Sequence, residues 1–135
     1  MRVVIRGAGD LASGVALRLW RAGMDVVLLD VEKPTAIRRT VAFSEAIVHG
    51  KQTVEDVTAR LATAETAEET LAAGMIPVLV DSEGRSIPTL RPDVLVDAIL
   101  AKRNLGTKIC DAPVVIGVGP GFTAGVDCHA VVETM

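Results

Sequence analysis

The sequence predicts an α/β fold with a mostly parallel sheet, flanking helices and a small irregular β-rich segment in the middle. Hydrophobic residues make up 50 % of the chain but aromatic residues only 2 %, so the core must consist of Val, Leu, Ile and Ala. Such side chains are typical of strands that are buried on both faces of a parallel sheet. A strand pattern over residues 2–6 also runs into a glycine turn and then an amphipathic helix, which is the opening of a Rossmann-like fold. We expect residues 1–135 to form one such domain.

The first helix and the second strand follow from apolar spacing. We expect the helix to end at Gly23, because glycine is a common residue just past a helix C-terminus. Residues 25–30 then form a largely buried strand that ends in Asp30. The expected buried stripe of the helix consists of Leu11, Ala12, Val15, Ala16, Leu19 and Trp20.

The middle of the chain has weaker patterns. Pro34 is placed to start a helix over residues 35–45. Residues 46–49 resemble a short strand, residues 50–52 a turn, and residues 53–61 a second short strand. We expect His49 at the end of its strand for structural reasons.

The remaining elements follow in order, and one segment among them has an alternative prediction. Residues 66–69 have the capping-box form before a short helix that Gly74 ends. Residues 76–80 form a strand, residues 81–84 a turn, and residues 85–89 a short return strand. Residues 92–98 are interpreted as a strand passing into a short helical segment, the alternative being a helix over 93–103. A loop over 102–112 precedes the last clear strand, residues 113–118.

The glycine turn after the first strand is the main candidate binding element. Gly7 permits the turn, Gly9 lets a pyrophosphate approach the backbone, and Ala12 lets the helix pack on the strand. The helix N-terminus offers free N–H groups to a phosphate. Asp30 lies 23 residues after Gly7, close to the spacing of about 20 expected for a ribose-binding acid that favours NAD over NADP. We therefore predict that the phosphates are held by Gly7, Gly9, Asp10, Leu11 and Ala12, and the ribose by Asp30.

A second glycine loop, residues 119–125, follows the last clear strand. Ligands of open α/β sheets bind at the carboxyl ends of the strands, so the two loops could hold one ligand from both sides. In that reading Gly119, Pro120, Gly121 and Phe122 close the far side of the site. The alternative is that the glycines only supply positive φ angles for a turn.

Few residues could carry catalysis. The sequence has no Tyr, which excludes the Tyr-x-x-x-Lys apparatus of short-chain dehydrogenases, and only two His. His129 is the candidate general acid or base. It adjoins Asp127 and Cys128, but three consecutive residues cannot all face one metal ion, so no metal site is predicted.

Charge and cysteine content restrict the partners and the compartment. A net charge of −3 without a basic stripe argues against nucleic acid as a partner. No apolar run approaches the roughly 20 residues of a membrane span, and no signal peptide is recognised. Cys110 and Cys128 do not form a disulfide framework, so we expect a reduced cytoplasmic setting. Whether the chain forms a homo-oligomer is left open.

Four segments together resemble the YqeB family of accessory proteins of selenium-dependent molybdenum hydroxylase systems, which is related to the XdhC maturation factors. The segments are VIRGAGDLASG (4–14), RRTVAFSE (38–45), PDVLVDA (92–98) and GPGFTAG (119–125), the last followed by His129. The resemblance runs along essentially the whole chain. It departs from the family at Cys128, where an aliphatic residue is expected, and at the C-terminus, so we expect a truncated member.

The resemblance implies a Rossmann-like domain that serves the maturation or cofactor supply of a molybdenum hydroxylase of the xanthine dehydrogenase type. The expected ligand is NAD or the molybdopterin dinucleotide of the hydroxylase, and the hydroxylase is an expected partner. Whether the chain catalyses a reaction is left open. The alternatives are a stand-alone NAD-dependent oxidoreductase that uses His129 and a non-catalytic interaction module.

Overall fold

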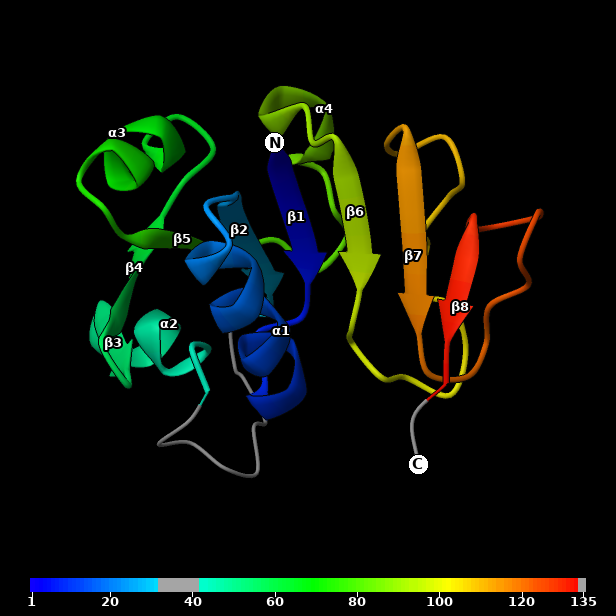
Figure 1. Ribbon diagram of the computed structural model, residues 1–135, viewed down its shortest axis with the longest axis horizontal. Coiled ribbons are helices and arrows are strands. Elements are labelled where there is room, and N and C mark those ends of the chain that lie inside the picture. Colours follow the sequence, from blue (N-terminus) through cyan, green and yellow to red (C-terminus); the bar gives the residue numbers. More distant parts are fainter. Residues whose placement is uncertain (32–41, 134–135) are drawn as a thin grey trace.

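The structure is a computed structural model that describes residues 1–31 and 42–133. Figure 1 shows a sheet that extends across the molecule, with helices on both of its faces. The elements are β1 (Arg2–Arg6), α1 (Asp10–Arg21), β2 (Asp25–Asp30), α2 (Glu45–His49), β3 (Lys51–Val54), β4 (Val57–Ala62), α3 (Ala67–Ala72), β5 (Ile76–Val80), α4 (Ile87–Leu90), β6 (Val94–Asp97), β7 (Val114–Val118) and β8 (Ala130–Val132).

The sheet has eight strands in the order β3-β4-β5-β2-β1-β6-β7-β8, and β3–β4 is its antiparallel pair. Without the β3–β4 hairpin the order is β5-β2-β1-β6-β7-β8, which corresponds to the Rossmann order 3-2-1-4-5-6. This confirms the predicted Rossmann-like α/β fold, in which the hairpin is the β-rich insertion. The strand order reverses between β1 and β6, and this reversal is where such folds bind ligands.

The two faces of the sheet carry separate cores, because successive strand residues point to opposite sides. On β1, Val3 and Ile5 belong to the first core cluster, which contains the buried residues of α1, whereas Val4 belongs to the second core cluster, together with Ala67 of α3 and Ile87 of α4. Figure 1 shows α1 in front of the sheet and no helix in front of β6, β7 and β8. The crossovers from β6 to β7 and from β7 to β8 are loops.

Helix α1 buries most of the predicted stripe. Ala12 and Ala16 are buried as expected, and Val15, Leu19 and Trp20 pack, partly buried, against the same core cluster. Leu11 is the exception at 38 % exposed, and Ser13 and Leu17 are buried although the predicted stripe did not include them. The buried face therefore extends towards Ser13, whose hydroxyl has partners in the core. The predicted end at Gly23 is confirmed by a hydrogen bond from its N–H to the carbonyl of Trp20, 3.0 Å long.

The middle of the chain corrects several predictions. Residues 46–49 belong to helix α2 rather than to a strand, since Ala46 packs into the first core cluster while Val48 faces solvent. Such a short apolar run does not distinguish helix from strand. The predicted turn at 50–52 and strand at 53–61 are instead a hairpin, β3 and β4, that turns at Glu55 with a φ of 56°. Most of the helix predicted over 35–45 lies outside the described residues.

Three further predictions change in the second half. Helix α3 exists, but the hydroxyl of Thr66 bonds to Thr63 instead of capping the helix. The return strand expected over 85–89 is replaced by helix α4, which begins at Ile87. The strand over 92–98 is confirmed as β6, whereas the helical segment after it is absent, because Leu100 has a φ of 63° that no helix accommodates. Among residues 1–31 and 42–133, no helix has the length and apolarity to cross a membrane.

Candidate nucleotide-binding site

The glycine turn after β1 is held in place by close backbone contacts. The Gly7 N–H donates to the carbonyl of Leu29 at 2.6 Å, and Gly7 has a φ of 107°. A Cβ atom on Gly7 would lie 2.9 Å from the carbonyl oxygen of Ala98, the residue after β6. Gly7 is thus required by its positive φ and by the close approach of the loop after β6.

Gly9, unlike Gly7, has open space beside its backbone. It is the N-cap residue of α1 in an extended conformation, and a Cβ atom on it would meet nothing within 4 Å. The space in front of the Gly9 backbone is therefore open. Ala12, one turn into the helix, is buried and packs in the first core cluster. The packing of Ala12 is as predicted, whereas the approach of a pyrophosphate to Gly9 stays a prediction.

The start of α1 presents free hydrogen-bond donors. Within residues 1–31 and 42–133, the backbone N–H groups of Gly9, Asp10 and Ala12 have no hydrogen-bond partner, whereas the Leu11 N–H bonds to the carboxylate of Asp10. Unpaired N–H groups and the positive end of the helix dipole make a helix N-terminus favourable for a phosphate.

Asp30 connects the end of β2 to the glycine turn. Its Oδ2 accepts from the Ala8 N–H at 3.1 Å, and its Oδ1 accepts from the Val31 N–H at 2.8 Å. Burial raises the pKa of the Asp30 carboxyl, an effect that the hydrogen bonds from Val31 and Ala8 partly offset. Each carboxylate oxygen keeps acceptor capacity for a ligand hydroxyl.

Ser13 is a contributor that the sequence analysis missed. Its hydroxyl donates to the carbonyl of Ala8 at 3.2 Å and accepts from the N–H of Phe43 at 2.7 Å. The Ala8 carbonyl also accepts from the Ser44 N–H at 2.8 Å. Every polar backbone atom of Ala8 is thus engaged, which fixes the middle of the glycine turn. The predicted buried stripe of this helix did not include Ser13, and its hydroxyl, close to the helix start, was the available sign of a polar contact there.

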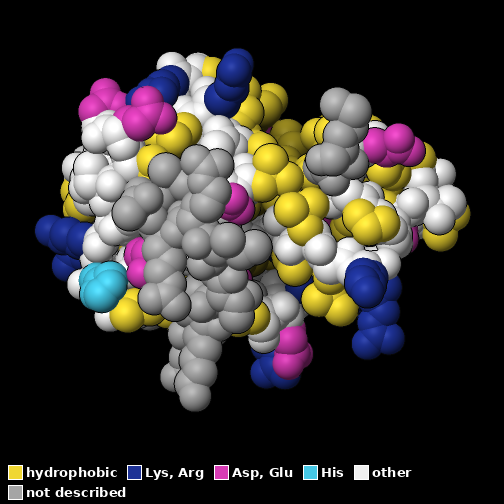
Figure 2. Space-filling model, turned by 90° about the horizontal axis from the view of Figure 1, so that it is seen from below, with side chains coloured by type: hydrophobic (Ala, Val, Ile, Leu, Met, Phe, Trp, Pro, Cys, Tyr) yellow, Lys and Arg dark blue, Asp and Glu magenta, His cyan; other side chains and the backbone are white. Residues whose placement is uncertain are grey.

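The turn, Asp30 and the loop after β6 enclose one crevice of about 270 Å³ at the carboxyl ends of β1, β2 and β6. It lies at the reversal of strand order and brings together all six residues predicted for the first glycine turn and the ribose. The lining residues are Gly7, Ala8, Gly9, Asp10, Leu11, Ala12, Asp30, Val31, Ala98, Ile99 and Leu100. Figure 2 views the molecule from this end and shows hydrophobic side chains gathered on the half that carries β6 to β8.

The second glycine loop lies beside this crevice and does not line it. Gly119, Pro120 and Phe122 line a separate hollow together with Val131 and Glu133. Gly121 is packed against the loop after β6, since a Cβ atom on it would lie 2.6 Å from Cα of Arg103. The two glycine loops therefore do not face each other across one cavity.

The aromatic ring of Phe122 has a packing partner of its own. It lies over Gly117 of β7, where a Cβ atom would come within 2.4 Å of the ring. Leu100 separates the two glycine loops, because it lines the crevice and its Cδ2 would lie 3.0 Å from a Cβ on Gly119.

His129 is away from the crevice. Its backbone N–H donates to the Val115 carbonyl at 2.7 Å, and its Nδ1 accepts from the Val115 N–H at 2.8 Å. Val115 is near the start of β7, whereas ligands bind at the ends of the strands. The structure thus uses His129 to extend the pairing of β8 with β7.

The cysteines are far from equivalent. Cys110 is exposed, while Cys128 is completely buried in the second core cluster, where burial raises the pKa of its thiol. The neighbouring Asp127 accepts from the Thr123 N–H and from Asn104. Within the part of the chain that the structure describes, no group of three or more His, Cys, Asp or Glu side chains could hold a metal ion.

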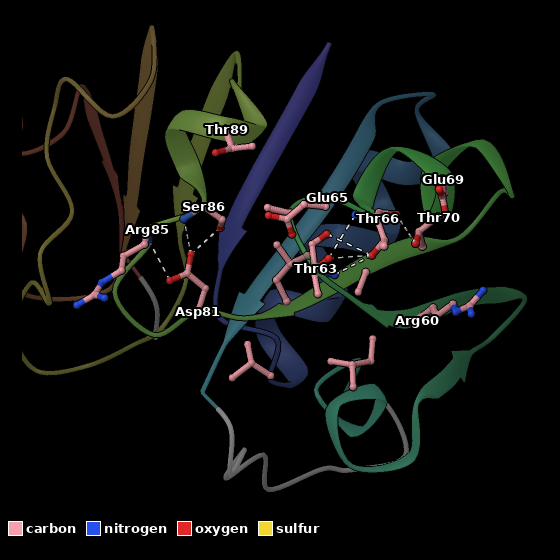
Figure 3. Close-up of a pocket in the computed structure, with 15 residues that line it drawn as sticks. Arg60, Thr63, Glu65, Thr66, Glu69, Thr70, Asp81, Arg85, Ser86 and Thr89 are labelled. Carbon is pink, nitrogen blue, oxygen red and sulfur yellow. Dashed lines mark hydrogen bonds between the residues drawn. The ribbon is translucent and has the colours of Figure 1, made fainter.

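A larger cleft, about 840 Å³, lies between α3 and α4, and several of its polar groups are bonded within local turns. Figure 3 shows Asp81 accepting hydrogen bonds from Ser86 and Arg85, and Thr63 bonded to Thr66. These are the bonds that order the chain ahead of α4 and α3. The smaller crevice is the better candidate for a binding site, because it combines Asp30 with three N–H groups that have no partner within residues 1–31 and 42–133.

Fold and site define a class: a Rossmann-like α/β fold with a glycine turn and an acidic β2 terminus at its topological switch point. The chain is 61 % identical over 133 residues to an Escherichia coli (strain K12) protein named "Uncharacterized protein YqeB". The match covers 98 % of this chain and 25 % of that protein, so the chain spans about a quarter of the relative's length. No protein-family model and no solved structure matches the chain. Homology to YqeB is thereby confirmed, and the relative's name assigns no activity.

Proposed function

We propose that the chain binds a dinucleotide through the crevice at the end of β1 and serves as a nucleotide-binding accessory protein for a molybdenum hydroxylase of the xanthine dehydrogenase type. The observation that carries the binding proposal is the combination of the Asp30 carboxylate with the N–H groups of Gly9, Asp10 and Ala12, which have no partner among the described residues. A pyrophosphate fits the N–H groups and a ribose diol the carboxylate. The hydroxylase rests on the family resemblance, and the cytoplasmic setting rests on the resemblance and on the cysteine content.

The ligand is NAD or a molybdopterin dinucleotide, because both contain a pyrophosphate that the same helix terminus would bind. Among the described residues that line the crevice, the carboxyls of Asp10 and Asp30 are the candidates for a general acid or base. A stand-alone oxidoreductase that depends on His129 has less support, since that side chain is bonded to the start of β7. Cofactor handling is therefore the function that we favour over hydride transfer.

Calorimetric titration of the folded protein with NAD, NADP and a molybdopterin dinucleotide tests the proposal. The decisive pair of variants is Gly9→Ala and Gly14→Ala, because a Cβ atom at either position meets nothing within 4 Å. Both variants should fold, but only Gly9→Ala places a methyl group where the phosphate approaches. We expect affinity to fall about 10-fold or more in Gly9→Ala, while Gly14→Ala binds as the wild type does.

Two results would contradict the proposal. One is a folded wild-type protein that binds none of the three ligands. The other is equal binding by Gly9→Ala and Gly14→Ala, which would place any nucleotide elsewhere on the molecule.

A further inference from the structure

Arg6, the last residue of β1, is a charged side chain in the core, 1 % exposed. Its Nη1 donates to the Thr107 hydroxyl at 2.7 Å. Its Nη2 donates to the carbonyls of Ser82 and Leu105 at 2.9 and 3.0 Å. One guanidinium group thus joins the chain after β5 to the chain after β6, directly beneath the glycine turn.

Thr107 passes this interaction on to Asp97, the last residue of β6. Its hydroxyl donates to Oδ2 of Asp97 at 2.6 Å, and Asp97 is 2 % exposed. The direction is set by chemistry, because guanidinium only donates and carboxylate only accepts. Asp97 then accepts the N–H of Ile99 on its other oxygen, Oδ1, at 3.1 Å.

The chain of bonds ends in the wall of the candidate site. Ile99 and Leu100 line the crevice opposite the glycine turn. Leu100 has a φ of 63°, a left-handed conformation that L-residues rarely adopt, and the residue is 42 % exposed. Strained residues of this kind persist only where their surroundings hold them and are concentrated at ligand sites.

Stability alone does not account for so polar an arrangement. Replacing buried charged networks by apolar side chains of similar volume is often neutral or stabilising. Arg6 and Asp97 are in register on adjacent strands, where two aliphatic residues would pack as their neighbours do. The network instead joins two loops, after β5 and after β6, at the ligand-binding edge of the sheet.

We propose that Arg6, Thr107 and Asp97 are positioning residues that hold Ile99 and Leu100 as the second wall of the nucleotide crevice. This inference rests on the proposed function and adds the residues that preorganise its site. Thr107 is the link that can be removed with least change, because valine has its shape without its hydroxyl.

The test compares Thr107→Val with Thr107→Ser, using NAD calorimetry and NMR hydrogen exchange of the Ile99 amide. Thr107→Val should weaken NAD binding about 10-fold and accelerate Ile99 exchange, since the bond to Asp97 is lost. Thr107→Ser keeps the hydroxyl and should restore both values. Thr53→Val is the matched control, because it removes a threonine hydroxyl bonded to Thr58 in the distant hairpin, and it should change neither.

A second variant covers the case in which Thr107→Val does not fold. Leu100→Gly suits the positive φ and removes the wall, so it should fold and bind NAD several-fold more weakly. Suppose that the wild type binds NAD, and that Leu100→Gly and any folded Thr107→Val protein bind it with the same affinity. That result overturns this inference and leaves the proposed function intact. If the folded wild type binds no nucleotide, the proposed function fails, and this inference with it.

Discussion

The N–H of Ala8 and the carboxylate of Asp30 lie 3.1 Å apart, joining the glycine turn after β1 to the last residue of β2. The two predicted halves of a dinucleotide site are therefore in direct contact. An anionic Asp30 would accept hydrogen bonds from a ribose diol and repel a 2′-phosphate.

We expect Asp30→Asn to weaken NAD binding about 10-fold and to narrow the preference for NAD over NADP, because a hydrogen bond to a charged acceptor is lost. Calorimetry with both nucleotides measures this. Asp25→Asn, an exposed change at the opposite end of β2, is the control and should leave both affinities unchanged. Unaltered binding in Asp30→Asn would show that Asp30 does not contact the ligand.

Asp30 also makes stability depend on pH. Burial raises its pKa in the folded protein above the ordinary value of 3.8, so between these two values the folded state keeps a proton that the unfolded chain releases. The stabilising contribution is complete below pH 3.8 and is lost as the pH rises through the folded pKa. Urea denaturation at several pH values across this range should show that the free energy of unfolding declines less with rising pH in Asp30→Asn than in the wild type. An identical decline in both would rule out this contribution.

Asp81 should make the stability depend on pH in the opposite direction from Asp30. Burial tends to raise the pKa of its carboxyl, but the hydrogen bonds from Ser86 and Arg85 outweigh burial and lower the pKa below 3.8. Its contribution to stability is present above pH 3.8 and is lost as the pH falls through the lowered pKa. Acid denaturation of Asp81→Asn should therefore show a weaker pH dependence below pH 3.8 than that of the wild type. A steeper dependence would contradict the assignment.

Gly7→Ala should destabilise the protein by about 3 kcal/mol, because a left-handed alanine is strained and its methyl group meets the Ala98 carbonyl. Gly23→Ala has a comparable φ, 91°, in open space and should cost only about 1 kcal/mol. Thermal and urea unfolding of the pair separate the clash from the backbone strain. Equal losses would mean that the loop after β6 yields to the methyl group.

Gly117→Ala should cost about 2 kcal/mol, since its methyl group overlaps the ring of Phe122. In a Phe122→Ala background the same change should cost much less, because the space is then vacant. Urea unfolding of the two single variants and the double variant measures this coupling. Additive losses would indicate that Phe122 moves aside freely.

Sequence patterns predicted the structure correctly where one short segment contains all the residues that the local backbone conformation requires. The turn from β1 into α1 needs a glycine with positive φ and an extended glycine N-cap, both within four residues, and Gly7 and Gly9 supply them. Patterns were misleading for short apolar runs such as residues 46–49, because helix α2 is chosen by the packing of Ala46 against the sheet. The return strand expected at 85–89 failed for the same reason, since Ile87 is held in the second core cluster.

The sequence by itself determined the Rossmann-like class, the glycine turn and the acid at the end of β2, because each depends on local backbone requirements and on spacing along one βαβ unit. Only the tertiary structure decided that residues 119–122 stand beside the crevice rather than across it, and that His129 pairs with β7. It alone revealed that Arg6 reaches Thr107, 101 residues away. Contacts of that range depend on the order of strands in the sheet, which no local pattern encodes.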